Sequence, residues 1–186
     1  MGAVKEYLTQ LVKVIESLPE EKVQDFVDTI AEAYNNDRQV VFLGNGGSAA
    51  TASHFACDMQ KGIGAAGPKR FKAMALTDNV PVITAWANDT DYSRIFVGQI
   101  DTWVNPGDLV IAISGSGNSP NVIEAVELAN KKGAITYGLT GFDGGRLAKI
   151  AKKSIVVHSN NMQQIEDVHI VLDHLVYTCL KQIIGH

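Results

Sequence analysis

Two pairs of residues in this sequence each combine an imidazole with a carboxylate on one predicted helix. His54 and Asp58 are four residues apart in the segment that follows a glycine-rich turn, so a helix would place them on one face. Glu166 and His174 lie in a long apolar segment near the C-terminus that also predicts a helix. Imidazoles and carboxylates can act as general acids and bases or as ligands of a divalent cation.

The spacing along the C-terminal segment leaves two interpretations open. On a helix, Glu166, His169 and Asp173 share one side, and His174 is rotated by about 80° from Glu166. These side chains could converge on a ligand. The two histidines could equally be packed and hydrogen-bonded on the apolar face of that helix.

A glycine-rich turn precedes the first pair. The apolar run 40–43 predicts a buried strand, residues 44–47 read Gly-Asn-Gly-Gly, and Ser48 begins the next helix. Glycines allow a sharp turn and let a ligand approach the backbone closely. The free N–H groups of the first helical turn, the positive end of the helix dipole and the Ser48 hydroxyl then point into one space. The segment therefore predicts an anion site.

A second loop repeats this chemistry. The loop Ser114-Gly115-Ser116-Gly117-Asn118-Ser119 follows the predicted strand 108–113, which is apolar after Asp108, and precedes another predicted helix. Hydroxyls and backbone N–H groups can hold a phosphate without lysine or arginine. Two such loops at the carboxyl ends of strands in one α/β sheet indicate a shared crevice and favour a small phosphorylated ligand.

The first loop also fits the dinucleotide-binding fingerprint, because Gly44, Gly46 and Ala49 have its spacing. That fingerprint expects an acidic residue about 20 positions further on, and Asp78 comes too late in the chain. A dinucleotide fold also does not require the hydroxyl-rich second loop. A dinucleotide-dependent oxidoreductase is therefore the less favoured alternative.

The composition bounds the class of protein. The chain has 186 residues, of which 46% are hydrophobic and 19% charged, which predicts one folded globular domain. Its formal net charge of −4 argues against broad binding to nucleic acid or membranes, and no apolar run reaches the ~18 residues that a spanning helix needs. There is no signal-peptide pattern, and the two cysteines give no disulfide framework, so we expect a cytoplasmic protein.

Hydrophobic periodicity predicts an α/β fold. Amphipathic segments over 4–18 and 23–34 predict an N-terminal helical hairpin within residues 1–36. Strands are then predicted over 40–43, 71–76, 108–113, 134–139 and 154–157. They alternate with a helix from residue 48, a glycine-rich loop over 62–68, and helices over 82–87, 93–104, 119–132, 146–151 and 162–184. Such alternation predicts a parallel sheet with helices on both faces.

Together these motifs resemble the sugar isomerase (SIS) domain family, and most closely its phosphoheptose isomerase branch. The resemblance covers nearly the whole chain and is carried by GNGGSAATASHF, ISGSGNSPNVIEAVELA, GLTGFDGG and IEDVHIVLDH. It implies one SIS domain over 1–186, built as a three-layer α-β-α sandwich whose five-stranded parallel sheet has flavodoxin-like order. It also implies a homo-oligomer, usually a tetramer, with active sites between subunits.

The resemblance further implies an activity and a set of residues. Members of the branch isomerise sedoheptulose 7-phosphate to an aldoheptose phosphate, with Asp58 and His174 here at the catalytic positions. The substrate-binding or phosphate-binding positions it implies are Asn45, Gly46, Gly47, Ser48, Asp89, Ser114, Ser116, Ser119 and Glu166. The ligand positions it implies for Zn²⁺ are His54, Asp58, Glu166 and His174.

Three polar residues depart from the pattern of the branch. Asp58 replaces a glutamate and is one methylene shorter, Glu166 replaces a glutamine, and Gln163 replaces an aspartate. These departures suggest a different sugar, metal or reaction geometry. They also leave the alternative that the protein is a non-catalytic SIS module, which binds a sugar phosphate or a protein partner.

Overall fold

The protein is described from a computed structural model that covers residues 2–63 and 68–184. Residues 1, 64–67 and 185–186 lie outside the described residues. They include most of the glycine-rich loop predicted over 62–68 and both ends of the domain predicted over 1–186.

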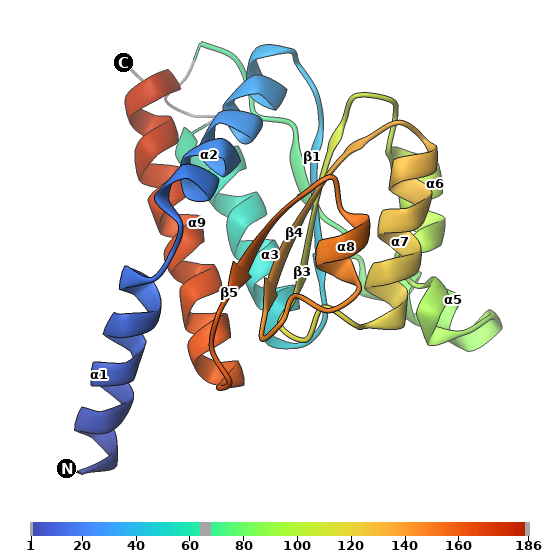
Figure 1. The fold of residues 1–186 in the computed structure, drawn as a ribbon. Helices are drawn as coiled ribbons and strands as arrows, with labels where there is room; N and C mark the ends of the chain where they lie inside the picture. Colours follow the sequence, from blue (N-terminus) through green and yellow to red (C-terminus); the bar gives the residue numbers. More distant parts are fainter. Residues whose placement is uncertain (1, 64–67, 185–186) are drawn as a thin grey trace.

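A five-stranded parallel sheet forms the centre of the fold, in the order β2-β1-β3-β4-β5 (Figure 1). Its strands are β1 (Val40–Gly44), β2 (Ala73–Ala75), β3 (Leu109–Ser114), β4 (Ile135–Gly141) and β5 (Lys153–Val157). This is the flavodoxin-like order, so the predicted fold class is confirmed. In this order β1 and β3 are neighbours whose chain connections leave in opposite directions along the sheet, and a crevice forms at that point.

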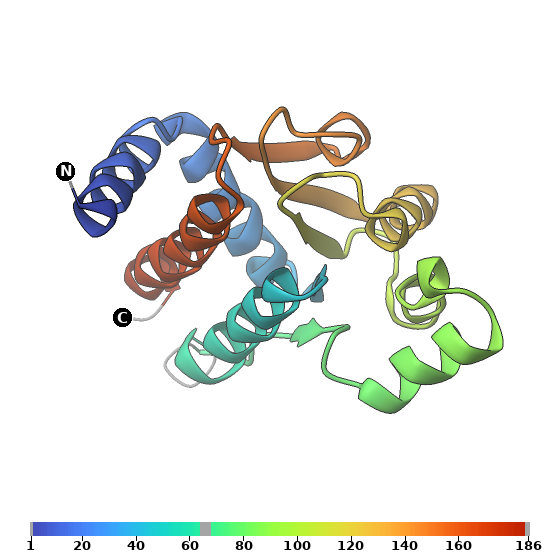
Figure 2. The same cartoon turned by 90° about the horizontal axis from the view of Figure 1, so that it is seen from below.

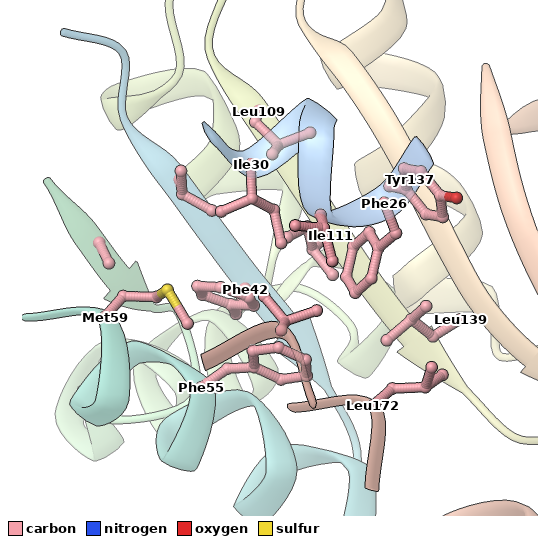
Figure 3. Packing of buried hydrophobic residues seen from close by; sticks show 14 of the residues in the cluster. Phe26, Ile30, Phe42, Phe55, Met59, Leu109, Ile111, Tyr137, Leu139 and Leu172 are labelled. Atoms are coloured by element: carbon pink, nitrogen blue, oxygen red, sulfur yellow. The ribbon is translucent and has the colours of Figure 1, made fainter. Parts of the chain in front are cut away.

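Alternating side chains of the strands build two hydrophobic cores. Along β1, Val40 and Phe42 point to one face of the sheet, whereas Val41 and Leu43 point to the other. Figure 3 shows the first core, in which Phe42 stacks on Phe55 with ring centroids 5.0 Å apart. Because every residue of β1 is buried, the strand reads as a continuous apolar run.

Helices cover both faces (Figure 2). The first core is covered by α2 (Glu20–Asn35), α3 (Gly47–Cys57) with the π-helix η1 (Asp58–Ile63), and α9 (Met162–Ile184). The second is covered by α5 (Val80–Asp89), η2 (Tyr92–Arg94), α6 (Val97–Trp103), α7 (Pro120–Lys131) and α8 (Leu147–Ile150). None of the described helices is long and apolar enough to cross a membrane.

Two elements show the clearest differences from the prediction. The strand predicted over 71–76 is reduced to three residues, because β2 lies at the edge of the sheet and pairs only with β1. The helix predicted over 93–104 is divided. Its start forms the 3₁₀ turn η2, because the Asp91 carboxylate accepts a hydrogen bond from the Ser93 N–H and caps that turn.

The helical hairpin predicted within residues 1–36 is open. Helix α1 (Ala3–Glu16) extends away from α2 in Figure 1 and has no buried residue. It lies along α9, where the Tyr7 hydroxyl donates a hydrogen bond to Asp167 and Gln164 donates one to Gln10. Contacts with α9 therefore set the direction of α1.

One histidine of α9 is enclosed in the first core. His169 is 1% exposed, and its Nε2 lies 3.2 Å from the carbonyl oxygen of Thr140 in β4, to which the neutral ring can donate. Burial lowers the pKa of His169 to about 4. The fold therefore requires the uncharged imidazole.

This burial predicts a pH-dependent part of the folding free energy. Between pH 6.5 and pH 4 the unfolded chain binds the proton and the folded chain does not, so acidification favours unfolding. From pH 7.5 to pH 5, the stability of the wild type should fall by about 2 kcal/mol more than that of His169→Gln. Urea unfolding of both proteins at the two pH values measures this, and equal losses would contradict it. The comparison cancels groups that titrate alike in both proteins.

Candidate active site

The turn between β1 and α3 has the geometry that its glycines predict. Gly46 has φ +56°, in the left-handed region that glycine adopts without strain. A Cβ atom on Gly47 would stand 2.7 Å from a carboxylate oxygen of Glu166, so a larger residue there would displace the Glu166 carboxylate from its position. The backbone of the first turn of α3 is thereby open to its surroundings, and its N–H groups can face an anion.

The loop after β3 lies beside this turn. The side-chain amides of Asn45 and Asn121 form a reciprocal pair, with N···O distances of 2.9 and 2.8 Å, and this pair links the two loops. Within the second loop the hydroxyls of Ser114 and Ser119 are 3.3 Å apart. The Asn118 N–H donates to the Ser116 hydroxyl, which holds that side chain in the turn.

A cavity of about 140 Å³ lies between the two loops, and we call it the serine cavity. Its lining residues are Asn45, Ser48, Ile113, Ser114, Gly115, Ser116, Ser119, Met162 and Glu166. The structure thus brings together all four serines that the sequence proposes for phosphate binding. No lysine or arginine is among these lining residues, so binding of an anion there depends on hydroxyl, amide and backbone donors.

Glu166 enters the serine cavity from the first turns of α9. Its carboxylate lies against Gly47, at the N-terminal end of α3, where the helix dipole favours negative charge. Of its two predicted roles, substrate binding and metal binding, Glu166 therefore has the position that substrate binding requires.

A second group forms where α3 passes α9. The Nε2 atoms of His54 and His174 are 3.2 Å apart. The Nε2 atom of His54 also lies 3.7 Å from a carboxylate oxygen of Asp58 and 3.8 Å from one of Asp173. One ligand atom from each of these four residues lies within 4.8 Å of the others. We call His54, Asp58, Asp173 and His174 the His/Asp cluster.

The His/Asp cluster fits a divalent cation. Asp173 is completely buried, and neither of its carboxylate oxygens has a hydrogen-bond partner among the described residues. Burial, and then the negative charge of Asp58, raise the pKa of Asp173 to about 8. A cation among two carboxylates and two imidazoles would remove this penalty, and zinc accepts both ligand types.

The cluster differs in one member from the ligand set implied by the resemblance. His54, Asp58 and His174 are together, but Asp173 stands in the place proposed for Glu166. Glu166 lies eight residues before His174, roughly 12 Å along the axis of α9, and reaches the serine cavity instead. The sequence held a signal for Asp173, since it falls within the stripe formed by Ile165, Val168, Leu172 and Val176, where a buried carboxylate needs a partner.

Asp89, also proposed for substrate binding, lies outside both groups. It is an exposed residue at the end of α5, and its carboxylate accepts a hydrogen bond from Asn88.

A hollow next to the serine cavity contains residues that the sequence did not indicate. Asp91, Tyr92 and Ser93 line it, it shares Asn45 and Ser119 with the serine cavity, and the Tyr92 hydroxyl donates to Asn45. The serine cavity therefore opens beside a space that could hold more of a ligand.

Known proteins are similar to this chain over most of its length. The SIS domain family matches residues 5–141. A phosphoheptose isomerase of Aliarcobacter butzleri is 36% identical over an alignment of 186 positions that covers 98% of this chain and 97% of that protein. A probable phosphoheptose isomerase of Thermoplasma acidophilum is 37% identical over 178 residues, covering 96% of this chain and 97% of its own.

A solved structure agrees with these sequence matches. The phosphoheptose isomerase of Neisseria gonorrhoeae superposes with a TM-score of 0.87 at 30% identity, over 96% of this chain and 97% of that one. On the extent of these matches, the chain belongs to the SIS domain family and, within it, to the family of the phosphoheptose isomerases.

Proposed function

We propose that this protein is an aldose–ketose isomerase that converts sedoheptulose 7-phosphate to a heptose 7-phosphate through an enediol. The observation that carries the proposal is the placement of the serine cavity and the His/Asp cluster along the same two helices, α3 and α9. The full-length phosphoheptose isomerases to which the chain is similar support the choice of substrate.

The phosphate group is bound in the serine cavity. Ser48, Ser114, Ser116 and Ser119 donate through their hydroxyls, and the turn Asn45-Gly46-Gly47 contributes backbone N–H groups at the start of α3. From Gly47 to His54 the axis of α3 rises by roughly 10 Å. That separation suits a substrate with several carbons between its phosphate and its carbonyl group.

The isomerisation moves one proton between neighbouring carbons. The Asp58 carboxylate takes the proton from carbon, the electron pair of the C–H bond forms the double bond of the enediol, and the carbonyl oxygen gains a proton. Asp58 then returns the proton to the adjacent carbon while the other hydroxyl of the enediol loses its proton, which leaves the carbonyl group at the new position. His174 serves the oxygen side, since its exposed ring faces the same cluster as Asp58.

Zinc is the metal we expect in the His/Asp cluster. When bound, it would polarise the substrate carbonyl and stabilise the developing negative charge on oxygen. We also propose that the protein resides in the cytoplasm. The free thiols of Cys57 and Cys179 are consistent with a reducing compartment.

We also propose that the protein is a homo-oligomer, with a tetramer as the expected state. Val4, Leu8 and Val12 are 76%, 55% and 53% exposed and follow one another at four-residue spacing on the outer side of α1. Such a stripe on a helix is typical of a surface that packs on another chain. Because α1 lies along α9, a partner there would stand close to the helix that carries Glu166 and His174.

Removing one hydroxyl from the serine cavity tests the phosphate site. Ser116→Ala should weaken binding of sedoheptulose 7-phosphate by roughly 1.5–3 kcal/mol, or roughly 10- to 150-fold, because a hydrogen bond to a charged group is lost. Isothermal titration calorimetry measures the change. Ser17→Ala, an exposed serine at the end of α1, is the matched control and should bind normally. Unchanged affinity in both Ser48→Ala and Ser116→Ala would contradict the assignment.

Neutralising the proposed base tests the reaction. Asp58→Asn should lower turnover by roughly 100- to 10,000-fold while substrate still binds, since it removes general-base catalysis. Asp28→Asn on the exposed side of α2 is the control. Full activity of Asp58→Asn would show that another group is the base. A wild-type protein that is stabilised by sugar phosphates but never converts them would instead be a binding module.

A charge on the outer stripe of α1 tests the assembly. Leu8→Glu should dissociate the oligomer, because burying an unpaired carboxylate in an apolar contact is unfavourable. Thr9→Glu, on the adjacent exposed position, is the control and should leave it intact. Sedimentation velocity at micromolar concentration reads the mass of each protein. A wild type that sediments as a stable monomer contradicts the proposal.

A further inference from the structure

The carboxylate of Asp173 stands in an environment that does not favour it on its own. The side chain is fully buried in α9, between Leu172 and the apolar turn that contains Val176, and neither oxygen accepts a hydrogen bond from a described residue. Burying a charged group without a partner costs several kcal/mol, whereas a leucine would stabilise the same position. Its presence points to a cationic partner at this place.

The direction of Asp173 shows where such a cation would sit. Its oxygen lies 3.8 Å from Nε2 of His54, the same ring nitrogen that faces Nε2 of His174 at 3.2 Å. A carboxylate that only oriented the His54 ring would approach Nδ1, on the far side from the metal. Asp173 is therefore on the ligand side of the imidazole. Tetrahedral zinc with bonds of roughly 2.0–2.1 Å holds neighbouring ligand atoms roughly 3.3–3.4 Å apart, close to these separations.

The two carboxylates of the His/Asp cluster are not equivalent. The Asp173 side chain has no solvent exposure, but that of Asp58 is 25% exposed. Asp58 also stands at the junction of α3 with η1, and π-helical turns are frequent at functional sites. A base has to be reached by substrate, whereas a ligand can be enclosed. Catalytic zinc sites usually have three protein ligands and keep one position open.

We propose that Asp173, together with His54 and His174, binds the metal ion directly, and that Asp58 remains unligated and free to act as the base. The assignment of Asp58 rests on the proposed isomerase function, but the assignment of Asp173 as a ligand does not. With Asp173 in this role, the shorter side chain of Asp58 does not have to reach the metal. His174, which the proposed function places on the oxygen side, then acts there through the cation that it holds and does not transfer the proton itself.

Zinc binding by two isosteric variants tests whether Asp173 is a ligand and Asp58 is not. Asp173→Asn and Asp58→Asn each remove one charge and keep the side-chain volume. After removal of metal with a chelator, zinc affinity is measured by competition with a chromophoric chelator. Asp173→Asn should weaken zinc binding by roughly 100-fold or more, beyond the roughly 10- to 100-fold lost with an outer-sphere partner. Asp58→Asn should retain wild-type affinity within about threefold, and its Co²⁺ form should keep the wild-type visible spectrum while that of Asp173→Asn changes.

Loss of folding does not obscure this result. Because the asparagine amide is neutral, metal-free Asp173→Asn should unfold at a temperature no lower than the metal-free wild type, and only its stabilisation by zinc should be lost. Tight zinc binding by Asp173→Asn, weak binding by Asp58→Asn, or no zinc binding by the wild type would each overturn the assignment. A wild type that binds zinc through Asp173 but does not isomerise the sugar phosphate would refute the proposed function and leave the ligand assignment standing.

Discussion

The contact between α3 and α9 is the constraint on which the site depends. These helices lie side by side on one face of the sheet (Figure 1), although more than a hundred residues separate them in the chain. Their apolar sides share the first core, where Phe55 of α3 and Leu172 of α9 are both fully buried. The residue before Phe55 is His54 and the residue after Leu172 is Asp173. Packing of the two apolar residues thus fixes the distance between the two polar ones.

The parallel sheet supplies the other half of the site. β1 and β3 are adjacent, so both loops that leave their carboxyl ends open at the same crevice. The glycines of these loops make the backbone accessible, and the pair Asn45–Asn121 holds one loop against the other. The first loop runs directly into α3, so this helix carries Ser48 of the anion site and His54 of the His/Asp cluster, which connects the two features through one element.

The sequence was most informative where the signal is local. A buried strand such as β1, a glycine turn and the serine loop are each set by a few neighbouring residues, and their positions followed from the pattern. Neighbouring residues in the sequence do not decide whether Glu166 or Asp173 belongs to the His/Asp cluster. Both lie on related sides of α9, and only the depth to which each turn is buried against α3 and the sheet separates them. The direction of α1 depended in the same way on contacts with a helix at the other end of the chain.

The distribution of charge links the two groups. Glu166 lines the serine cavity, Asp58 is partly exposed in the His/Asp cluster, and Asp173 is buried behind it. No basic side chain is among the described residues that line the serine cavity. A phosphate can still bind there, because hydroxyls, amides and a helix N-terminus supply partial positive charge without an ion pair. The Asp173 carboxylate has no such compensation, since neither of its oxygens accepts a hydrogen bond from the part of the chain that the structure describes. A cation at the His/Asp cluster would compensate the buried acid, and the same cation would stabilise negative charge that develops on a carbonyl oxygen.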